Sequence, residues 1–149
     1  MTNTVYFDMD GTLAALFFIK GFSEALEAGD TTPYTIAKPL FDTDTMATVI
    51  AALKTKGYDI GIISYVDAKN LDAGAKAKRD WLAHYFPYAN PSKVHIVTKA
   101  TPKSAYCTKG DILVDDAKAN REDWESVGGT AINAYFRAKV PMIEALKSL

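Results

Sequence analysis

The segment Thr4-Val5-Tyr6-Phe7-Asp8-Met9-Asp10-Gly11-Thr12 joins a short apolar run to two aspartates and a glycine. β-Branched and aromatic residues favour a β-strand, and an apolar run of this length is typical of a buried one. Gly11 allows the chain to turn sharply directly after the acids. We therefore predict a buried strand that delivers Asp8 and Asp10 at its carboxyl end.

Downstream of this segment, apolar runs alternate with amphipathic stretches. We predict further strands at residues 58–63, 94–97, 111–114 and 130–134, and helices around 46–53, 81–85, 122–127 and 142–149. The first of these helices has a candidate N-cap at each of residues 43, 44 and 45. Residues 13–43 are irregular and predict one or two short helices, inserted after the first strand as a minimal cap. This order predicts an α/β fold of three layers, Rossmann-like, with a mainly parallel five-stranded sheet in a single domain of residues 1–149.

The composition is that of an ordinary globular chain, with 48% hydrophobic and 23% charged residues and a formal net charge of -1. Such a balance favours neither a nucleic-acid partner nor a membrane surface, so we expect neither. The only cysteine is Cys107, which excludes an internal disulfide and fits a reducing compartment. The start of the chain does not resemble a signal peptide, and we expect a cytoplasmic protein.

Polar side chains follow three of the predicted strands. Asp8 and Asp10 come after the first strand, Ser64 after the second and the pair Asp115-Asp116 after the fourth. Because the carboxyl ends of parallel strands meet at one edge of a sheet, we expect these side chains to converge. Two carboxylates about 4 Å apart repel by about 4 kcal/mol at an effective dielectric constant near 20, so the cluster needs a cation. All-oxygen ligands favour Mg²⁺ over zinc.

With these residues in view, the sequence resembles the haloacid dehalogenase (HAD) superfamily of phosphohydrolases. Residues 7–13 (FDMDGTL) are similar to the first motif of that superfamily, and residues 62–64 (IIS) to the second. Lys103 resembles the third motif and residues 113–116 (LVDD) the fourth, in the superfamily's order. The resemblance covers the whole chain and implies an HAD-like fold and phosphatase activity.

The resemblance also implies roles for the acids. Asp8 would attack phosphorus and form an aspartyl-phosphate intermediate, and Asp10 would act as the general acid and base. Mg²⁺ would be held by the Asp8 carboxylate, the Asp10 backbone carbonyl and Asp115, with support from Asp116.

Two further residues would bind the transferring phosphoryl group by the same resemblance. They are the Ser64 hydroxyl and a lysine, for which we favour Lys103 over Lys99 and Lys109 because Lys103 follows a plausible helix start at Thr101-Pro102.

A narrower resemblance points to the 5'(3')-deoxyribonucleotidase branch. Residues 78–87 (KRDWLAHYFP), 95–97 (HIV) and 111–116 (DILVDD) are similar to that branch, which implies nucleoside (deoxy)monophosphates as substrates. The insertion at residues 13–43 is shorter than the cap of that branch. Phe17 and Phe18 would either stack on a nucleobase or pack the insertion onto the core.

Other readings stay open at this point. The chemistry would be the same if the substrate were a sugar phosphate or another phosphorylated compound. An inactive relative that binds a phosphorylated ligand or a partner protein is a second alternative, and a homo-oligomer is possible. A phosphorelay receiver is disfavoured because residues 97–99 (VTK), at the end of the third strand, contain no aspartate.

Overall fold

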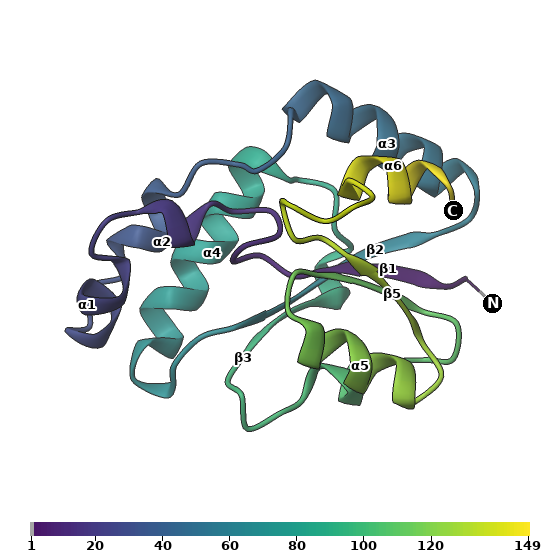
Figure 1. Ribbon diagram of the computed structural model, residues 1–149. Helices are drawn as coiled ribbons and strands as arrows, with labels where there is room; N and C mark the ends of the chain where they lie inside the picture. The colour runs from purple at the N-terminus through teal and green to yellow at the C-terminus, as the bar shows by residue number, and fades with distance from the viewer. Residues whose placement is uncertain (1) are drawn as a thin grey trace.

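A computed structural model describes residues 2–149 (Figure 1). Across these residues, five strands form one sheet: β1 (Thr4–Phe7), β2 (Asp59–Tyr65), β3 (Val94–Val97), β4 (Ile112–Asp115) and β5 (Thr130–Asn133). The strand order is β3-β2-β1-β4-β5 and every pairing is parallel. The predicted fold class is therefore confirmed. Because β1 is central, its carboxyl end is flanked by the ends of β2 and β4.

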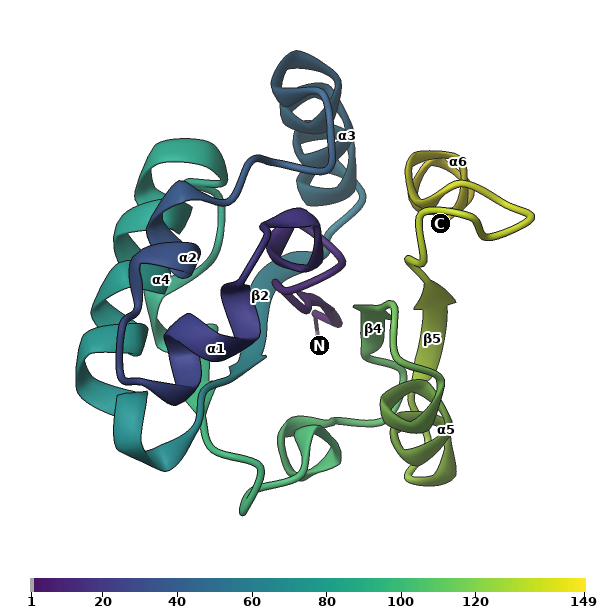
Figure 2. The same cartoon turned by 60° about the vertical axis from the view of Figure 1, so that its left-hand side comes forward.

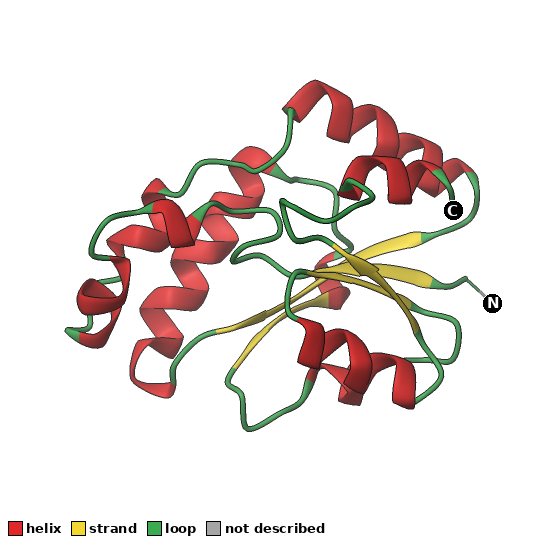
Figure 3. Cartoon of the chain, in the orientation of Figure 1, coloured by secondary structure: helices red, strands yellow, loops and turns green. Residues whose placement is uncertain are grey.

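Helices cover both faces of this sheet. Four of them follow the strands: α3 (Thr43–Thr55), α4 (Leu71–Tyr85), α5 (Lys118–Ser126) and α6 (Met142–Lys147). In Figure 1, α3 and α6 lie side by side above the sheet and α5 lies below it. Figure 3 shows the same three layers by element type. Short 3₁₀ turns lie in the connections between these strands and helices: η2 (Ala68–Asn70), η3 (Pro91–Lys93) and η4 (Lys103–Tyr106).

The central strand sends its side chains alternately to the two faces. Val5 and Phe7, both 0% exposed, join the large core cluster under α3 and α6. Tyr6 faces the opposite layer, where its ring meets that of Trp124 from α5 at a centroid distance of 5.7 Å. Full burial of one such apolar side chain contributes about 1.5–3 kcal/mol. Burial on both faces explains why this strand is apolar from Val5 to Phe7.

Two predicted helix starts are wrong. The N-cap of α3 is Asp42, whose carboxylate accepts from the Thr45 backbone N–H at 2.9 Å, so the cap does not lie within residues 43–45. The helix predicted from residue 122 begins at Lys118. Its first turn contributes no apolar side chain to the core, since Lys118 and Ala119 are exposed while Asn120 and Arg121 bond Asp115, so hydrophobic periodicity did not reveal it.

The segment predicted as a minimal cap forms the 3₁₀ turn η1 (Leu16–Phe18) and two short helices, α1 (Phe22–Glu27) and α2 (Thr32–Ile36). Figure 2 shows α1 and α2 beside α4. The indole N–H of Trp81 on α4 donates to the Ala37 carbonyl at 2.7 Å, which fixes the end of this segment. None of the helices within residues 2–149 combines the length and apolar composition required to span a bilayer.

Candidate active site

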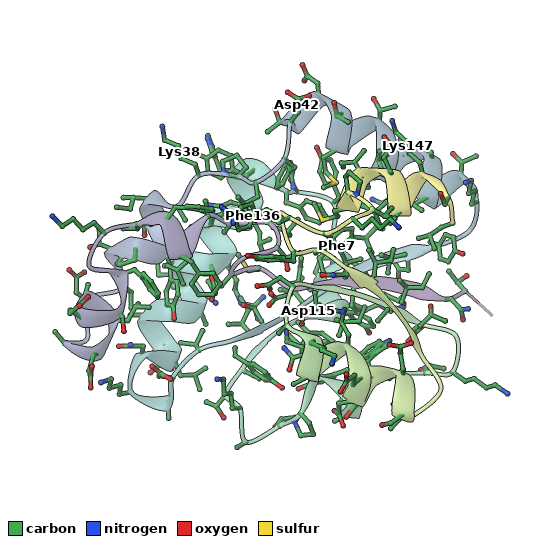
Figure 4. The ribbon with its side chains drawn as sticks, viewed as in Figure 1. Phe7, Lys38, Asp42, Asp115, Phe136 and Lys147 are labelled. Carbon is green, nitrogen blue, oxygen red and sulfur yellow. The ribbon has the colours of Figure 1, made fainter. Side chains whose placement is uncertain are left out.

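Three carboxylates meet where β1 and β4 end. Asp8 directly follows β1, and its backbone N–H donates to the Val114 carbonyl at 2.9 Å. Asp115 is the last residue of β4 and is 0% exposed. Asp8, Asp115 and Asp116 each offer a carboxylate oxygen, and these oxygens lie within 4.8 Å of one another. In Figure 4, Asp115 lies in the middle of the molecule, next to the beginning of α5.

Lys103 lies between two of these acids. Its Nζ donates to Asp8 Oδ1 and to Asp115 Oδ2, both at 2.8 Å, and the side chain is 2% exposed. Burial lowers the pKa of this ammonium group, but the attraction of Asp8 and Asp115 outweighs burial and raises it. Of the three candidate lysines, Lys103 therefore contacts the cluster. Lys99 lies at the edge of the neighbouring cavity, and Lys109 lies beside Gly128.

Thr12 connects the remaining pair of acids. Its hydroxyl lies 3.1 Å from Asp8 Oδ2 and 3.2 Å from Asp116 Oδ1, and it also accepts from the Asp116 backbone N–H at 3.2 Å. The chain can return to this point because Gly11 has φ +81°, where a side chain would strain the backbone. The sequence reasoning assigned no role to Thr12, although it lies in the first motif.

The cluster is short of positive charge. Burial and the neighbouring Asp8 raise the pKa of Asp115, and the same two causes raise the pKa of Asp116 to about 7. Three acids with one buried ammonium group leave an excess of negative charge, which without a cation is relieved by taking up protons. Closely spaced carboxylate oxygens are the ligands that Mg²⁺ prefers. The residues present thus fit a hard divalent cation.

Asp10 and Ser64 form a second group, centred on a lysine that the sequence reasoning missed. Lys78 Nζ donates to Asp10 Oδ2 at 2.8 Å, to Ser64 Oγ at 2.7 Å and to the Tyr65 carbonyl at 2.9 Å. Burial raises the pKa of Asp10, and Lys78 counteracts that rise. The Asp10 carboxylate belongs to this group and is not one of the three that converge at the end of β4.

A signal for Lys78 was present in the sequence. On a helix, positions three and four apart share a face, so Lys78 lies on the face of Trp81 and Leu82, both of which are buried. A lysine on the buried face of a helix rarely lacks a partner. The pattern therefore indicates a buried lysine at position 78 that pairs with an acid.

A cavity of about 460 Å³ opens next to both groups. Its walls combine the acids and Lys103 with side chains of the insertion, including the aromatic residues Phe17, Phe22 and Tyr34, and with Tyr65 at the end of β2. A smaller cavity of about 190 Å³ adjoins it and shares Phe17 and Asp116 with it. Phe17 therefore borders both spaces, whereas Phe18 lines the smaller one and is 64% exposed.

Comparison with known proteins identifies the fold. No protein-family profile matches the sequence, and no curated protein matches it. Among solved structures, a chain of the Pnkp1/Rnl/Hen1 complex is 18% identical with a TM-score of 0.57, over 89% of this chain and 45% of that one. A dehalogenase structure is 12% identical with a TM-score of 0.54, over 97% and 90% of the two chains.

The HAD domain of effector protein Lem4 from Legionella pneumophila is 14% identical with a TM-score of 0.43, over 93% of this chain and 89% of that domain. This chain spans less than half the length of the matched chain of the Pnkp1/Rnl/Hen1 complex. Sequence identities this low show that this chain and those structures share a fold, and nothing more specific. The chain has the α/β fold of the dehalogenase, with the acids at the carboxyl ends of its strands.

Proposed function

We propose that this chain is a phosphohydrolase of the haloacid dehalogenase superfamily, a Mg²⁺-dependent phosphomonoesterase with Asp8 as its nucleophile. The observation that carries the proposal is the cluster of Asp8, Asp115 and Asp116, whose carboxylate oxygens lie within 4.8 Å with Lys103 bonded to two of the acids. A purely structural role does not account for three clustered acids that share one buried ammonium group, because their mutual repulsion offsets the attraction of the lysine and leaves little net stabilisation of the fold.

The reaction has two displacements. A carboxylate oxygen of Asp8 attacks phosphorus, the bond from phosphorus to the ester oxygen breaks, and Asp10 gives its proton to the leaving oxygen. Asp10 then takes a proton from a water molecule that attacks the aspartyl phosphate, which releases inorganic phosphate and restores the Asp8 carboxylate. Mg²⁺, when held by Asp8, Asp115, Asp116 and the Asp10 backbone carbonyl, would neutralise charge on the phosphoryl oxygens.

Ser64 and Lys103 are proposed to bind the transferring phosphoryl group. Ser64 Oγ accepts a hydrogen bond from Lys78, so the Ser64 hydroxyl proton is free to donate to a phosphoryl oxygen. Lys103 Nζ uses two of its three N–H groups on Asp8 and Asp115, which leaves one for the substrate. Both donors act where negative charge accumulates during transfer.

We propose that the substrate is a nucleoside (deoxy)monophosphate, a small molecule present in the cytoplasm. The lining of the larger cavity includes both the acids and aromatic residues of the insertion, and aromatic side chains suit a planar base. Phe17 is the predicted base-stacking residue that borders this cavity. Phe18 lines the smaller adjoining cavity, so we assign it a smaller role in binding the base.

The test is phosphate release with Mg²⁺ from nucleoside monophosphates, sugar phosphates and phosphopeptides. We expect the highest kcat/KM for a nucleotide, and a Phe17→Ala variant should raise KM for it about tenfold, which is about 1.4 kcal/mol of stacking. Phe18→Ala, at the neighbouring position, is the matched control and should change KM less. Preference for a sugar phosphate would overturn the substrate proposal, and tight binding without turnover of any ester would favour the binding-module alternative.

A further inference from the structure

Lys78 is as deeply buried as the hydrophobic core, although it carries a charge. It is 1% exposed, and it lies on α4, at a distance in the sequence from all four resemblance motifs. An unpaired buried ammonium group would cost several kcal/mol, so its position has to be maintained by its contacts.

All three N–H groups of Lys78 are used within the protein. The acceptors are Asp10 Oδ2, Ser64 Oγ and the Tyr65 carbonyl, at 2.8, 2.7 and 2.9 Å. The ring of Tyr34, from α2 of the insertion, lies 4.4 Å from the same nitrogen. Since an ammonium group has three donors, none is left for a phosphoryl oxygen. Lys78 therefore does not bind the substrate directly.

Resting on the proposed function, we infer that Lys78 is a positioning residue that holds the Asp10 carboxylate and the Ser64 hydroxyl in one mutual arrangement. Asp10 follows β1 and Ser64 lies near the end of the neighbouring β2, and Lys78 is bonded to both. With Oδ2 of Asp10 held by Lys78, the other carboxylate oxygen is the one that exchanges a proton with the leaving oxygen. With Ser64 Oγ accepting from Lys78, the hydroxyl proton points toward the phosphoryl group.

This role has a kinetic signature. A misplaced acid slows only steps that need its proton, and general acid catalysis contributes about 10²–10⁴ in rate. An ester whose leaving oxygen is strongly basic, such as an alkyl phosphate, needs that proton. The leaving group of 2,4-dinitrophenyl phosphate is weakly basic and departs without it. A lysine that bound the phosphoryl group or merely stabilised the fold would affect all esters alike.

The experiment measures kcat/KM with Mg²⁺ for 2,4-dinitrophenyl phosphate, phenyl phosphate and an alkyl phosphate. The variants are Lys78→Met and Lys78→Gln, with Lys76→Met as the matched control. Lys76 is a lysine of the same helix whose side chain is 78% exposed and pairs only with Asp80 at the surface. Circular dichroism reports whether each variant is folded.

We expect Lys78→Met to lose about 100-fold on the alkyl phosphate and about threefold or less on 2,4-dinitrophenyl phosphate. Lys78→Gln should lose less on the alkyl ester, because its amide still donates to one partner. Lys76→Met should match the wild type on every ester. In an Asp10→Asn background, Lys78→Met should lose no more than it loses on 2,4-dinitrophenyl phosphate, because Asp10 is already gone and only the positioning of Ser64 remains to be lost.

Equal losses on all three esters, no loss on any, or a full additional loss in the Asp10→Asn background would each overturn the inference. If Lys78→Met does not fold, Lys78→Gln decides by the same comparison of esters. Failure of the proposed function would instead show as absence of ester hydrolysis by the wild type and by Lys76→Met. If neither hydrolyses any ester, Asp10 is not an acid catalyst and the inference falls with the proposed function.

Discussion

Replacing Asp8 by asparagine should abolish turnover and yet leave the fold almost as stable as before. The ion pair between Asp8 and Lys103, at 2.8 Å, contributes about 6 kcal/mol of attraction at an effective dielectric constant near 20. Repulsion of Asp8 by Asp115 and by Asp116, with oxygens within 4.8 Å, costs at least about 3.5 kcal/mol for each ionised acid. The repulsion between Asp8 and Asp116 is only partial near neutral pH, because the pKa of Asp116 is about 7.

Attraction and repulsion therefore nearly cancel, and an asparagine retains a side-chain oxygen that accepts from Lys103. We expect the free energy of unfolding of the metal-free protein to change by about 1 kcal/mol or less. For a chain of this size that is a shift of about 2–4 °C in Tm. Turnover should disappear, because an amide oxygen is a poor nucleophile.

The assay combines thermal unfolding in a chelator, thermal unfolding in Mg²⁺ and phosphate release on the same preparations. Mg²⁺ should raise the Tm of the wild type more than that of Asp8→Asn, because the variant has lost one of the three clustered carboxylates. Wild-type turnover by Asp8→Asn would refute Asp8 as the nucleophile. Destabilisation by more than about 3 kcal/mol in the chelator would refute the balance of charges.

Three further predictions concern the same cluster. Asp115→Ala should raise the Mg²⁺ concentration for half-maximal activity at least about tenfold in a metal titration, and an unchanged requirement would place the cation elsewhere. The raised pKa of Asp116 means that the metal-free fold holds an extra proton, so stability from this group is full near pH 4 and is lost as pH rises through about 7. The rise in Tm on adding Mg²⁺ should therefore be larger at pH 8 than at pH 5, and the reverse order would contradict the shift. Gly11→Ala should destabilise the protein by more than about 1 kcal/mol in chemical denaturation, because Gly11 has φ +81° and a methyl group there would meet the Asp116 carboxylate. Full stability would show that the turn tolerates a side chain.

The fold could be predicted because its signals are local. Residues 5–7 are apolar because β1 is covered on both sides, and the alternation of strands with helices implies a parallel sheet. Once the sheet is parallel, the topology brings strand ends to one edge, and Asp8 and Asp115 meet there without further information. Lys103 was harder to predict, because three lysines lie between β3 and β4 and only the 3₁₀ turn η4 determines which of them points inward.

The helix boundaries and the second buried lysine depend on tertiary contacts instead. Residues 118–121 of α5 (KANR) place no apolar side chain in the core, so a hydrophobic pattern cannot show that they are helical; Asn120 and Arg121 bond Asp115, which explains their position. Lys78 lies fourteen positions after Ser64, and only the packing of α4 against the strand ends brings the two together at 2.7 Å. A sequence pattern can mark Lys78 as buried, but it does not identify the acceptors.

The insertion is connected to the chemistry through the same lysine. Tyr34 of α2 covers the Lys78 ammonium group, and Trp81 on α4 donates to the Ala37 carbonyl at the end of α2. Tyr34 is 7% exposed, so α2 shields the lysine side of this ion pair, whereas the Asp10 side chain keeps 21% of its surface exposed and borders the cavity. The insertion thus contributes to the site beyond lining the cavity, because it covers the lysine that is bonded to Asp10, the proposed general acid. Removing the insertion would therefore alter proton transfer at Asp10 as well as the choice of substrate.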